Sequence, residues 1–394
     1  MTDEGRTGLI RSSDAPERAT LLELLFDVAY VAALTLTSMR LAEEVTPTGA
    51  VRLLVLVMAI WWTWSITALL TDFYNPERLP IQAMIAGKLL GSILLAASMP
   101  HAFSNLGWLF ATAYVAMHVG RGVVLVSVLR STTARTRAAR FLFWFVISGV
   151  LWIAGIFVEG WDRFGLWALA ITIDYVSAAL RYPTPMVGRV PLEQYEKASG
   201  HLGERYQQFL ILALGDLLLV PTLRIGASEF TALRVAAFVL AFVTTLLFWQ
   251  IYVFRAGAFL QMALDVRPGR ITRWAPYTHL LMVLGVVASA AGFDLVIDRP
   301  DGSTPAGLIC VIFGGPALFL IGRTAFEYEV FRTVSRARLG WLLVLVLVAP
   351  AMVFLPPVLV TATTCVVLLG IVVSDAVRAH HGMSATPDVS LREG

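Results

Sequence analysis

The sequence predicts an all-α polytopic integral membrane protein, with about twelve transmembrane helices in two parallel six-helix repeats. The prediction depends on three observations: an apolar composition, a regular series of apolar stretches, and landmarks that recur in both halves. Of the 394 residues, 58% are hydrophobic and 14% are charged, whereas soluble domains have about 25% charged residues. The composition therefore indicates a chain that lies largely in a lipid bilayer.

The apolar stretches have the length of membrane spans, because a helix needs about 20 apolar residues to cross a bilayer. The last two stretches are separated only by Pro356-Pro357. They form either two spans or one re-entrant pair, so we expect eleven or twelve spans. The expected spans are residues 20–42, 50–71, 79–99, 105–129, 140–158, 163–181, 205–223, 230–254, 275–297, 305–323, 339–355 and 358–377.

Loop charge and aromatic residues place these spans in the bilayer. Alternate loops are rich in arginine, such as the one with Arg137, while the loops between them carry acids such as Glu159. Because cytoplasmic loops carry an excess of Lys and Arg, we expect both termini at the cytoplasmic face of a multi-pass cell membrane. Most tryptophans, including Trp61, Trp62 and Trp64, fall near predicted span ends, as interfacial anchors do.

Several landmarks recur in the same order in the two halves, which indicates a duplication. The echoes are Glu17-Arg18 with Glu204-Arg205, Asp27 with Asp216, WWTW (61–64) with FWQIY (248–252), Gly120-Arg121 with Gly322-Arg323, and RAAR (137–140) with RARL (336–339). Six spans per half give both halves the same orientation. Parallel repeats of this kind place a pathway near the axis that relates them.

The expected organisation follows from the spans and the repeat. It comprises a cytoplasmic tail (1–19), a first repeat (20–181), a cytoplasmic linker with an interfacial amphipathic helix (182–203), a second repeat (204–378) and a cytoplasmic tail (379–394). The first tail is polar and lacks the apolar core of a signal peptide. We therefore expect the first span itself to direct membrane insertion.

Two carboxylates, Glu23 and Asp27, lie four residues apart in the first span and share one helix face, which Tyr30 continues. A charged side chain at the bilayer centre costs roughly 3 kcal/mol even on lenient scales, so such residues usually face a protein interior or a water-filled path. Two interpretations stay open. The pair forms a structural clamp with Arg18 or Arg121, or it belongs to a pathway or active site.

The fourth span has a polar face formed by Tyr114, His118 and Arg121, at positions i, i+4 and i+7. A buried arginine needs an acidic partner. For Arg121 we expect Asp27 as the first choice and Asp174 as the second. His118 either titrates near neutral pH or is a hydrogen-bonded core residue.

A lysine, Lys88, lies near the middle of the third span, far from either interface. A lysine so placed is paired with a carboxylate or loses its charge. Glu23, Asp27 and Asp174 are the candidate partners. Asp174 itself interrupts an apolar run in the sixth span, so it joins the same group of candidate residues.

His201 and Glu204 share a face where the seventh span begins, and Asp216 lies deeper in that span. His and Glu are metal ligands, but two ligands are too few for a site without help from elsewhere. The alternative is a helix cap, in which Glu204 lies near the helix N-terminus where the dipole favours an acid. We expect no metal and include all three residues among the candidates for ion or substrate binding.

The sequence contains no Walker loop, G-x-S-x-G elbow, dinucleotide fingerprint or zinc pattern. The commonest nucleotide-driven and hydrolytic mechanisms are therefore excluded, and we expect no cofactor. The basic residues are spread over many short loops, so no nucleic-acid partner is expected. The expected partners are the lipid bilayer and an ion or small-molecule substrate, and a homo-oligomer is left open.

The same landmarks resemble the bacterial low temperature requirement protein A (LtrA) family of inner-membrane proteins. The matching segments are ERATLLELLFDVAYVAAL (17–34), WWTW (61–64), the Ala-rich stretch that ends in Ala102-Phe103, LWALAITIDY (166–175) and HLGERYQQFLILALGD (201–216). The resemblance covers about residues 15–380. It implies a multi-pass bacterial membrane protein, and the family name refers to growth at low temperature rather than to a molecular activity.

The chain departs from the family pattern around the seventh span, which usually reads H-x-x-E-R-x-x-x-F-x-I-x-x-L-G-E. Asp216 replaces the usual Glu after Gly215, and Gln207-Gln208 replace a pair of small residues. The resemblance implies that Asp216 keeps the role of a carboxylate with a shorter reach.

Two functions are compatible with these features. The first is a secondary transporter or channel, in which Glu23, Asp27 and Asp216 bind a cation or proton. Lys88 and Arg121 would then set the electrostatic field or hold an anionic substrate. The alternative is a membrane-embedded enzyme that acts on a lipid or isoprenoid, with Glu23 or Asp27 as the acid. A path open to both faces favours transport, and a sealed, one-ended cavity favours the enzyme.

Overall fold

The computed structural model of the chain describes residues 8–11, 18–196, 200–253, 268–332 and 334–380. Within these ranges the regular elements are helices, apart from two isolated β-bridges. Eleven candidate spans are long and apolar enough to cross a membrane in the described part of the chain. The all-α polytopic fold is therefore confirmed, and the number of spans lies within the expected range.

The chain divides into two compact units, residues 1–212 with 264–276, and residues 213–263 with 277–394. Residues 1–7 and 12–17 of the predicted N-terminal tail, 197–199 of the predicted linker, 254–267, 333 and 381–394 lie outside the described residues. The two-repeat organisation and its boundaries stay predictions.

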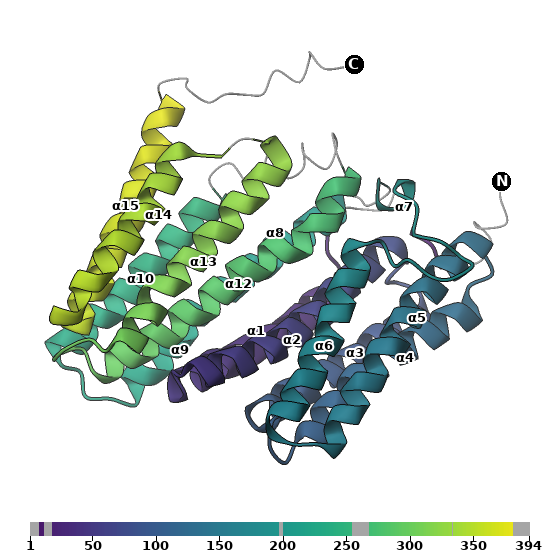
Figure 1. The fold of residues 1–394 in the computed structure, drawn as a ribbon. Helices are drawn as coiled ribbons and strands as arrows, with labels where there is room; N and C mark the ends of the chain where they lie inside the picture. The colour runs from purple at the N-terminus through teal and green to yellow at the C-terminus, as the bar shows by residue number, and fades with distance from the viewer. Residues whose placement is uncertain (1–7, 12–17, 197–199, 254–267, 333, 381–394) are drawn as a thin grey trace. The chain divides into compact units, whose positions relative to one another are not determined.

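The first unit is a bundle in which the purple to teal helices of Figure 1 lie side by side. Its helices are α1 (Leu21–Glu43), α2 (Pro47–Phe73), α3 (Leu79–Ser98), α4 (Gly107–Val128), α5 (Thr132–Ala154), α6 (Gly160–Ala179), the short α7 (Glu193–Glu196) and α8 (Gly200–Leu214). Along the bundle, α1 packs against α3, α3 against α4, α4 against α5, and α5 against α6. The helix α6 matches the predicted span at 163–181, although it is not among the eleven candidate spans.

The helix α2 is the centre of this bundle, because it packs against α1, α3, α4 and α6. A helix that is apolar on all sides is expected to be buried, and α2 is apolar along most of its length. Trp61, Trp62 and Trp64 of α2 are buried. The prediction that these tryptophans anchor span ends at the interface is therefore wrong.

Local sequence signals explain where the helices begin. Thr20 caps α1 by accepting a hydrogen bond from the backbone N–H of Glu23. Ser131 caps α5 in the same way, which satisfies a backbone donor that would otherwise lack a partner. Since α5 begins at Thr132 rather than at the predicted residue 140, Arg137 and Arg140 lie inside a helix and are buried.

The predicted seventh span, 205–223, is built from two helices, α8 and α9 (Asp216–Gly226), which are interrupted at Gly215. The α8 helix already begins at Gly200. His201 and Arg205 are consequently buried residues of this helix, although the linker with its interfacial helix was predicted to extend to residue 203. In the described part of that linker, only α7 and the first turn of α8 are helical.

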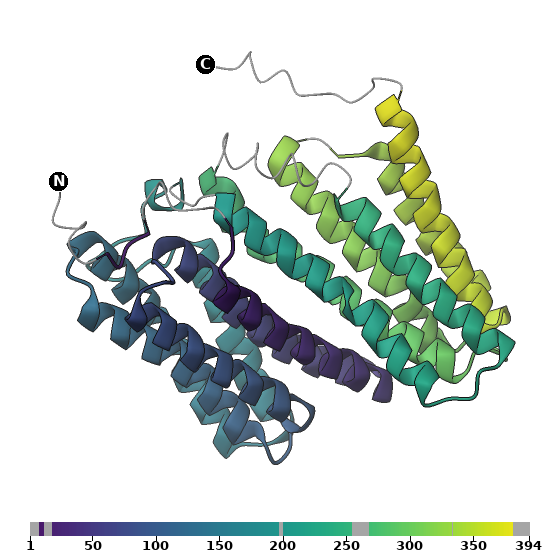
Figure 2. The same ribbon diagram turned by 180° about the vertical axis from the view of Figure 1, so that it is seen from behind.

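The second unit contains the other long helices. They are α9, α10 (Ala232–Val253), most of α12 (Pro268–Asp298), α13 (Ala306–Phe331), α14 (Arg336–Val348) and α15 (Pro357–His380). The helices α10 and α15 run side by side, as Figure 2 shows, and α15 also packs against α13 and α14. The segments Arg336–Phe354 and Pro357–Arg378 are each a candidate span, so the two last stretches are separate helices.

Small residues bring α12 and α13 close together in this unit. A Cβ atom added at Gly285 would lie 2.5 Å from the backbone N of Phe319, a distance that real Cβ atoms do not reach. Glycine at such a position lets two membrane helices approach closely and gain van der Waals contact.

Candidate functional site

The first group of buried polar residues lies where α1 begins, α2 ends and α8 begins. His201 of α8 has its Nε2 atom 3.3 Å from Oε1 of Glu23 and its Nδ1 atom 3.7 Å from Oδ1 of Asp72. All three side chains are buried. Each ring nitrogen of one imidazole therefore faces a carboxylate from a different helix.

The local sequence fixes Glu23 in this position through a capping box. Its Oε2 atom accepts a hydrogen bond from the backbone N of Thr20 at 2.8 Å, and the Thr20 hydroxyl accepts one from the backbone N of Glu23 at 3.3 Å. This reciprocal arrangement is the capping box of the pattern Thr-x-x-Glu. The same carboxylate thus holds the helix end through Oε2 and faces His201 with both oxygens, which lie 3.3 Å and 3.4 Å from Nε2.

Asp27 lies one turn further along α1 and is held by two donors. The Nη2 atom of Arg205 and the Nε1 atom of Trp64 each lie 2.8 Å from its Oδ1 atom. Asp27 and Arg205 are both inaccessible to solvent. The expectation that Arg121 is the first partner of Asp27 is wrong, because Arg205 takes that place.

The pairs Glu23–His201 and Asp27–Arg205 form successive steps of a ladder between α1 and α8. Glu23 and Asp27 are four residues apart on α1, and His201 and Arg205 are four residues apart on α8. The two residues of each helix therefore lie on one face of it. The ladder continues with Tyr30, whose ring lies 6.4 Å from that of Phe209 in an edge-on arrangement. The helices α1 and α8 therefore run in the same direction in this part of the bundle.

Aromatic rings cover the Asp27–Arg205 pair. The ring of Trp64 lies 4.2 Å from that of Phe209 and 5.1 Å from that of Tyr206, and the guanidinium of Arg205 lies 5.9 Å from the Trp64 ring. Apolar rings exclude water and lower the local dielectric. A charge-assisted hydrogen bond is stronger in such surroundings.

A second group lies deeper in the bundle, on the faces that α2 turns toward α3 and α4. Lys88 donates a hydrogen bond to Oγ1 of Thr67 at 2.7 Å. One turn earlier on α2, Oγ1 of Thr63 lies 3.1 Å from Nε2 of His118. The expected pairing of Lys88 with a carboxylate is not found among the described residues, in which its polar partner is a hydroxyl.

The remaining polar residues of the second group form two pairs. Tyr114 donates a hydrogen bond to Oδ2 of Asp174 at 2.7 Å, and the ring of Tyr114 lies 4.4 Å from that of His118. The hydroxyls of Tyr30 and Ser92 lie 2.7 Å apart. These contacts agree with the hydrogen-bonded interpretation of His118.

The helix α2 connects the two groups. Trp64 contacts Asp27, whereas Thr63 contacts His118 and Thr67 contacts Lys88. The candidate residues from spans 1, 3, 4 and 6 thus lie in the interior of one bundle, but they form two groups with different chemistry. The first contains three carboxylates, of Glu23, Asp27 and Asp72, and the second contains an amine, an imidazole and the carboxylate of Asp174.

Two candidates from the seventh span lie outside these groups. Glu204 is partly exposed and accepts a hydrogen bond from Gln208 at 2.7 Å. Asp216 is a buried residue in the first turn of α9 and belongs to the second unit. In the described residues, no three or more His, Cys, Asp or Glu side chains gather in a way that could hold a metal ion.

Sequence reasoning missed three residues of the first group. Asp72 and Trp64 were not considered as site residues, and Arg205 was named only as a landmark of the repeat. An acid near the end of the apolar stretch 50–71 was a signal for Asp72. The i, i+4 spacing of His201 and Arg205, which matches that of Glu23 and Asp27, was a signal for the ladder.

Comparison with known proteins decides the family. The family model described as bacterial low temperature requirement A protein (LtrA) matches residues 18–373. The chain belongs to the LtrA family. It is also 28% identical over 391 residues to the "Uncharacterized protein RA0937" of Rhizobium meliloti (strain 1021), over 96% of this chain and 94% of that protein. No solved structure matches the chain.

The family match places both motifs of the ladder inside the LtrA region. Glu23 and Asp27 belong to the first segment that carried the resemblance, and His201 and Arg205 belong to the last. This LtrA family protein is therefore a multi-pass membrane protein in which the two most specific segments meet through their charged side chains. The ladder contains an ion pair and, beside it, an imidazole held between two acids.

Proposed function

We propose that this LtrA family protein is a secondary transporter or channel that moves protons, with Glu23, His201 and Asp72 as its proton-binding group. The observation that supports the proposal is the position of the His201 ring, with a carboxylate 3.3 Å from Nε2 and another 3.7 Å from Nδ1. An imidazole can accept a proton on one nitrogen and release one from the other, and its ordinary pKa lies close to physiological pH.

The two steps of the ladder divide the roles between them. Asp27 receives two hydrogen bonds on one oxygen from Arg205 and Trp64, which suits a fixed, ionised clamp. Glu23 and Asp72 lie opposite a group that gains and loses a proton. The clamp interpretation thus fits Asp27, and the pathway interpretation fits Glu23.

The second group supplies further polar atoms toward the bundle interior. From Trp64, the face of α2 continues to Thr67 and Thr63, which contact Lys88 and His118. Buried ionisable groups in membrane helices commonly mark ion pathways and proton relays. These side chains provide hydroxyl, amine and imidazole groups along which a proton or a small solute would move.

Proton flux into liposomes tests the proposal. The purified protein is reconstituted into vesicles with an internal pH-sensitive dye, and a potassium gradient with valinomycin drives proton entry. We expect flux with the wild type and loss of most of it with His201→Gln, because glutamine cannot carry a proton between the acids. The matched control is His101→Gln at an exposed histidine, which should keep the wild-type rate.

The result that overturns the proposal is equally clear. Wild-type flux in folded His201→Gln protein would exclude His201 from the proton path. Vesicles that contain folded wild-type protein and show no flux would exclude proton transport. They would favour the alternative, a membrane-embedded enzyme that uses acid catalysis on a lipid or isoprenoid.

A further inference from the structure

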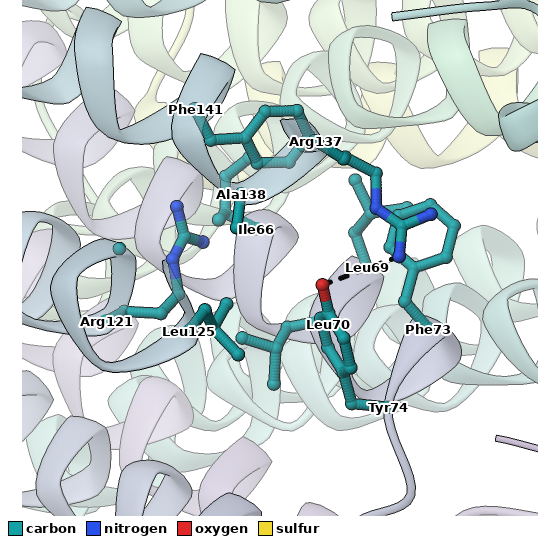
Figure 3. A pocket seen from close by; sticks show the side chains of 11 residues that line it. Ile66, Leu69, Leu70, Phe73, Tyr74, Arg121, Leu125, Arg137, Ala138 and Phe141 are labelled. Atoms are coloured by element: carbon teal, nitrogen blue, oxygen red, sulfur yellow. Dashed lines mark hydrogen bonds between the residues drawn. The ribbon is translucent and has the colours of Figure 1, made fainter. Parts of the chain in front are cut away.

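A small cavity lies in the first unit between α2, α4 and α5, and two arginines line it. Its volume is about 20 Å³, enough for one water molecule or one ion of similar size. Figure 3 shows Arg121 and Arg137 on opposite sides of it, with Leu125, Leu70 and other apolar side chains between them. The cavity is therefore positively charged and has mainly apolar walls.

Arg121 forms no ion pair with the described residues, although Asp174, its expected second partner, lies within electrostatic reach of it. Its side chain is 96% buried, and among the described residues no carboxylate lies within 4 Å of it. Its Nη2 atom has no hydrogen-bond partner, and its guanidinium lies 5.1 Å from the ring of Phe145. An unpaired buried charge is strongly unfavourable, so a species that neutralises Arg121 would be favoured here.

Arg137 has a similar environment on the other side of the cavity. It donates a hydrogen bond to the hydroxyl of Tyr74 at 3.4 Å, and its guanidinium lies 3.8 Å from the ring of Phe73. Both of these contacts, to Tyr74 and Phe73, are thus with neutral side chains. Lys88, which donates to a threonine hydroxyl, lies within electrostatic reach of Arg121 and in its protonated form adds to the positive potential.

The second unit contains a comparable pair of arginines that does have acids. Arg323 of α13 lies 3.5 Å from Glu327, one turn further along the same helix. Arg338 of α14 contacts the same Glu327, and it lies 3.0 Å from Asp375. The Gly-Arg sequence of α13 also occurs in α4 as Gly120-Arg121.

In the predicted repeat, the position that corresponds to Glu327 holds a leucine in α4. Counted one turn on from the arginine, Leu125 stands where Glu327 stands in α13, and Leu125 lines the cavity. In the predicted repeat alignment, the first unit thus has a leucine beside a small cavity where the second unit has a carboxylate.

We propose that this cavity binds a monovalent anion of halide size between Arg121 and Arg137. Guanidinium groups provide charge-assisted N–H donors, and the small apolar space disfavours strongly hydrated polyatomic anions such as sulfate. The site is separate from the group around His201, and its occupancy does not depend on the proposed proton movement.

Thermal unfolding at constant ionic strength tests the proposal. The intact protein is purified in sodium gluconate, sodium chloride then replaces the gluconate stepwise, and unfolding is followed by circular dichroism. A ligand that binds the folded state stabilises it by mass action, so we expect a saturable rise of Tm in chloride for the wild type. Sodium sulfate of the same ionic strength should give no saturable rise.

The informative variant is Leu125→Glu, which installs the carboxylate that the second unit has. We expect it to fold, to have at least the wild-type Tm in gluconate, and to lose the rise in chloride, because the new acid occupies the place of the anion. Arg323→Gln, in the pair that already has acids, is the matched control for Arg121→Gln. The control should keep the chloride response, and Arg121→Gln should lose it.

Direct binding of radioactive chloride to the purified protein gives a second measurement that does not require any variant to fold. Saturable binding to the wild type that sulfate does not displace supports the site. Absence of saturable chloride binding, or a Leu125→Glu protein that keeps the full chloride response, would overturn it. Loss of proton flux in liposomes would leave this result unaffected, so the two proposals fail separately.

Discussion

The guanidinium of Arg205 lies 2.8 Å from the carboxylate of Asp27, although 178 residues separate them in the chain. The same separation relates Glu23 and His201, one turn earlier. The first and seventh spans of the sequence are thus aligned in parallel by two successive charged pairs. Helix association in a bilayer lacks a hydrophobic driving force between helices and depends on packing and interhelical hydrogen bonds, so these pairs are expected to specify which helices meet.

The first prediction concerns the stability of the Asp27–Arg205 pair. Removal of one partner from a buried pair costs about 3–5 kcal/mol, because the other charge is left without compensation. We expect Asp27→Asn and Arg205→Gln each to lower the unfolding free energy by such an amount. The double variant should lose clearly less than the sum of the two. Chemical unfolding in detergent, analysed as a double-mutant cycle, measures the coupling, and additive losses would contradict the pairing.

The second prediction isolates the hydrogen bond from Trp64 to Asp27. Trp64→Phe keeps an aromatic ring against Phe209 but removes the N–H donor, which should cost about 1–3 kcal/mol because the acceptor is charged. Trp161→Phe is the matched control, since Trp161 is 60% exposed and its loss should change the unfolding free energy little. Equal losses for the two variants would show that ring volume, and not the hydrogen bond, matters at Trp64.

Much of the fold could be predicted from the sequence, because span length is a property of the bilayer and hydropathy alone reveals it. The misplaced boundaries have local causes. At the start of α5, the predicted loop containing Arg137 proved to be helix, because apolar content and not the Ser131 cap was used to find the helix start. The buried tryptophans of α2 were assigned to the interface because a sequence does not reveal that a span is surrounded by other helices.

The candidate site was predicted less well. Spacing along one helix reveals which residues share a face, and it correctly grouped Glu23, Asp27 and Tyr30. It does not reveal which helix lies opposite, and so Arg121 was chosen for Asp27 in place of Arg205. The correspondence of Asp27 with Asp216 and the parallel repeat itself stay predictions.

The third prediction concerns topology. In a variant with Cys310→Ser and Cys365→Ser, single cysteines at Thr133 and Ser303 should be labelled from opposite sides of the membrane, with Thr133 cytoplasmic. Both residues are exposed in loops or at helix ends, and Ser303 is preferable to Gly302, whose φ of +83° favours glycine. The reason is that four candidate spans and α6 lie between the two positions, with α8 and α9 counted as one span. Five crossings, an odd number, put the two residues on opposite sides. Labelling from the same side would contradict the positive-inside assignment.

The fourth prediction concerns Lys88, whose ammonium is buried and contacts a hydroxyl rather than an acid. Replacement of a buried charge by an apolar side chain of similar volume is often neutral or stabilising. Lys88→Met should therefore fold with a Tm in gluconate equal to or above that of the wild type. It should also bind chloride more weakly, since the positive potential near Arg121 falls.

Thr67→Val, which removes the hydroxyl that Lys88 contacts, should lower the Tm instead, because it leaves the ammonium without that partner. Circular dichroism and a chloride titration measure both effects, and a large loss of stability in Lys88→Met with unchanged chloride affinity would assign Lys88 to a structural role.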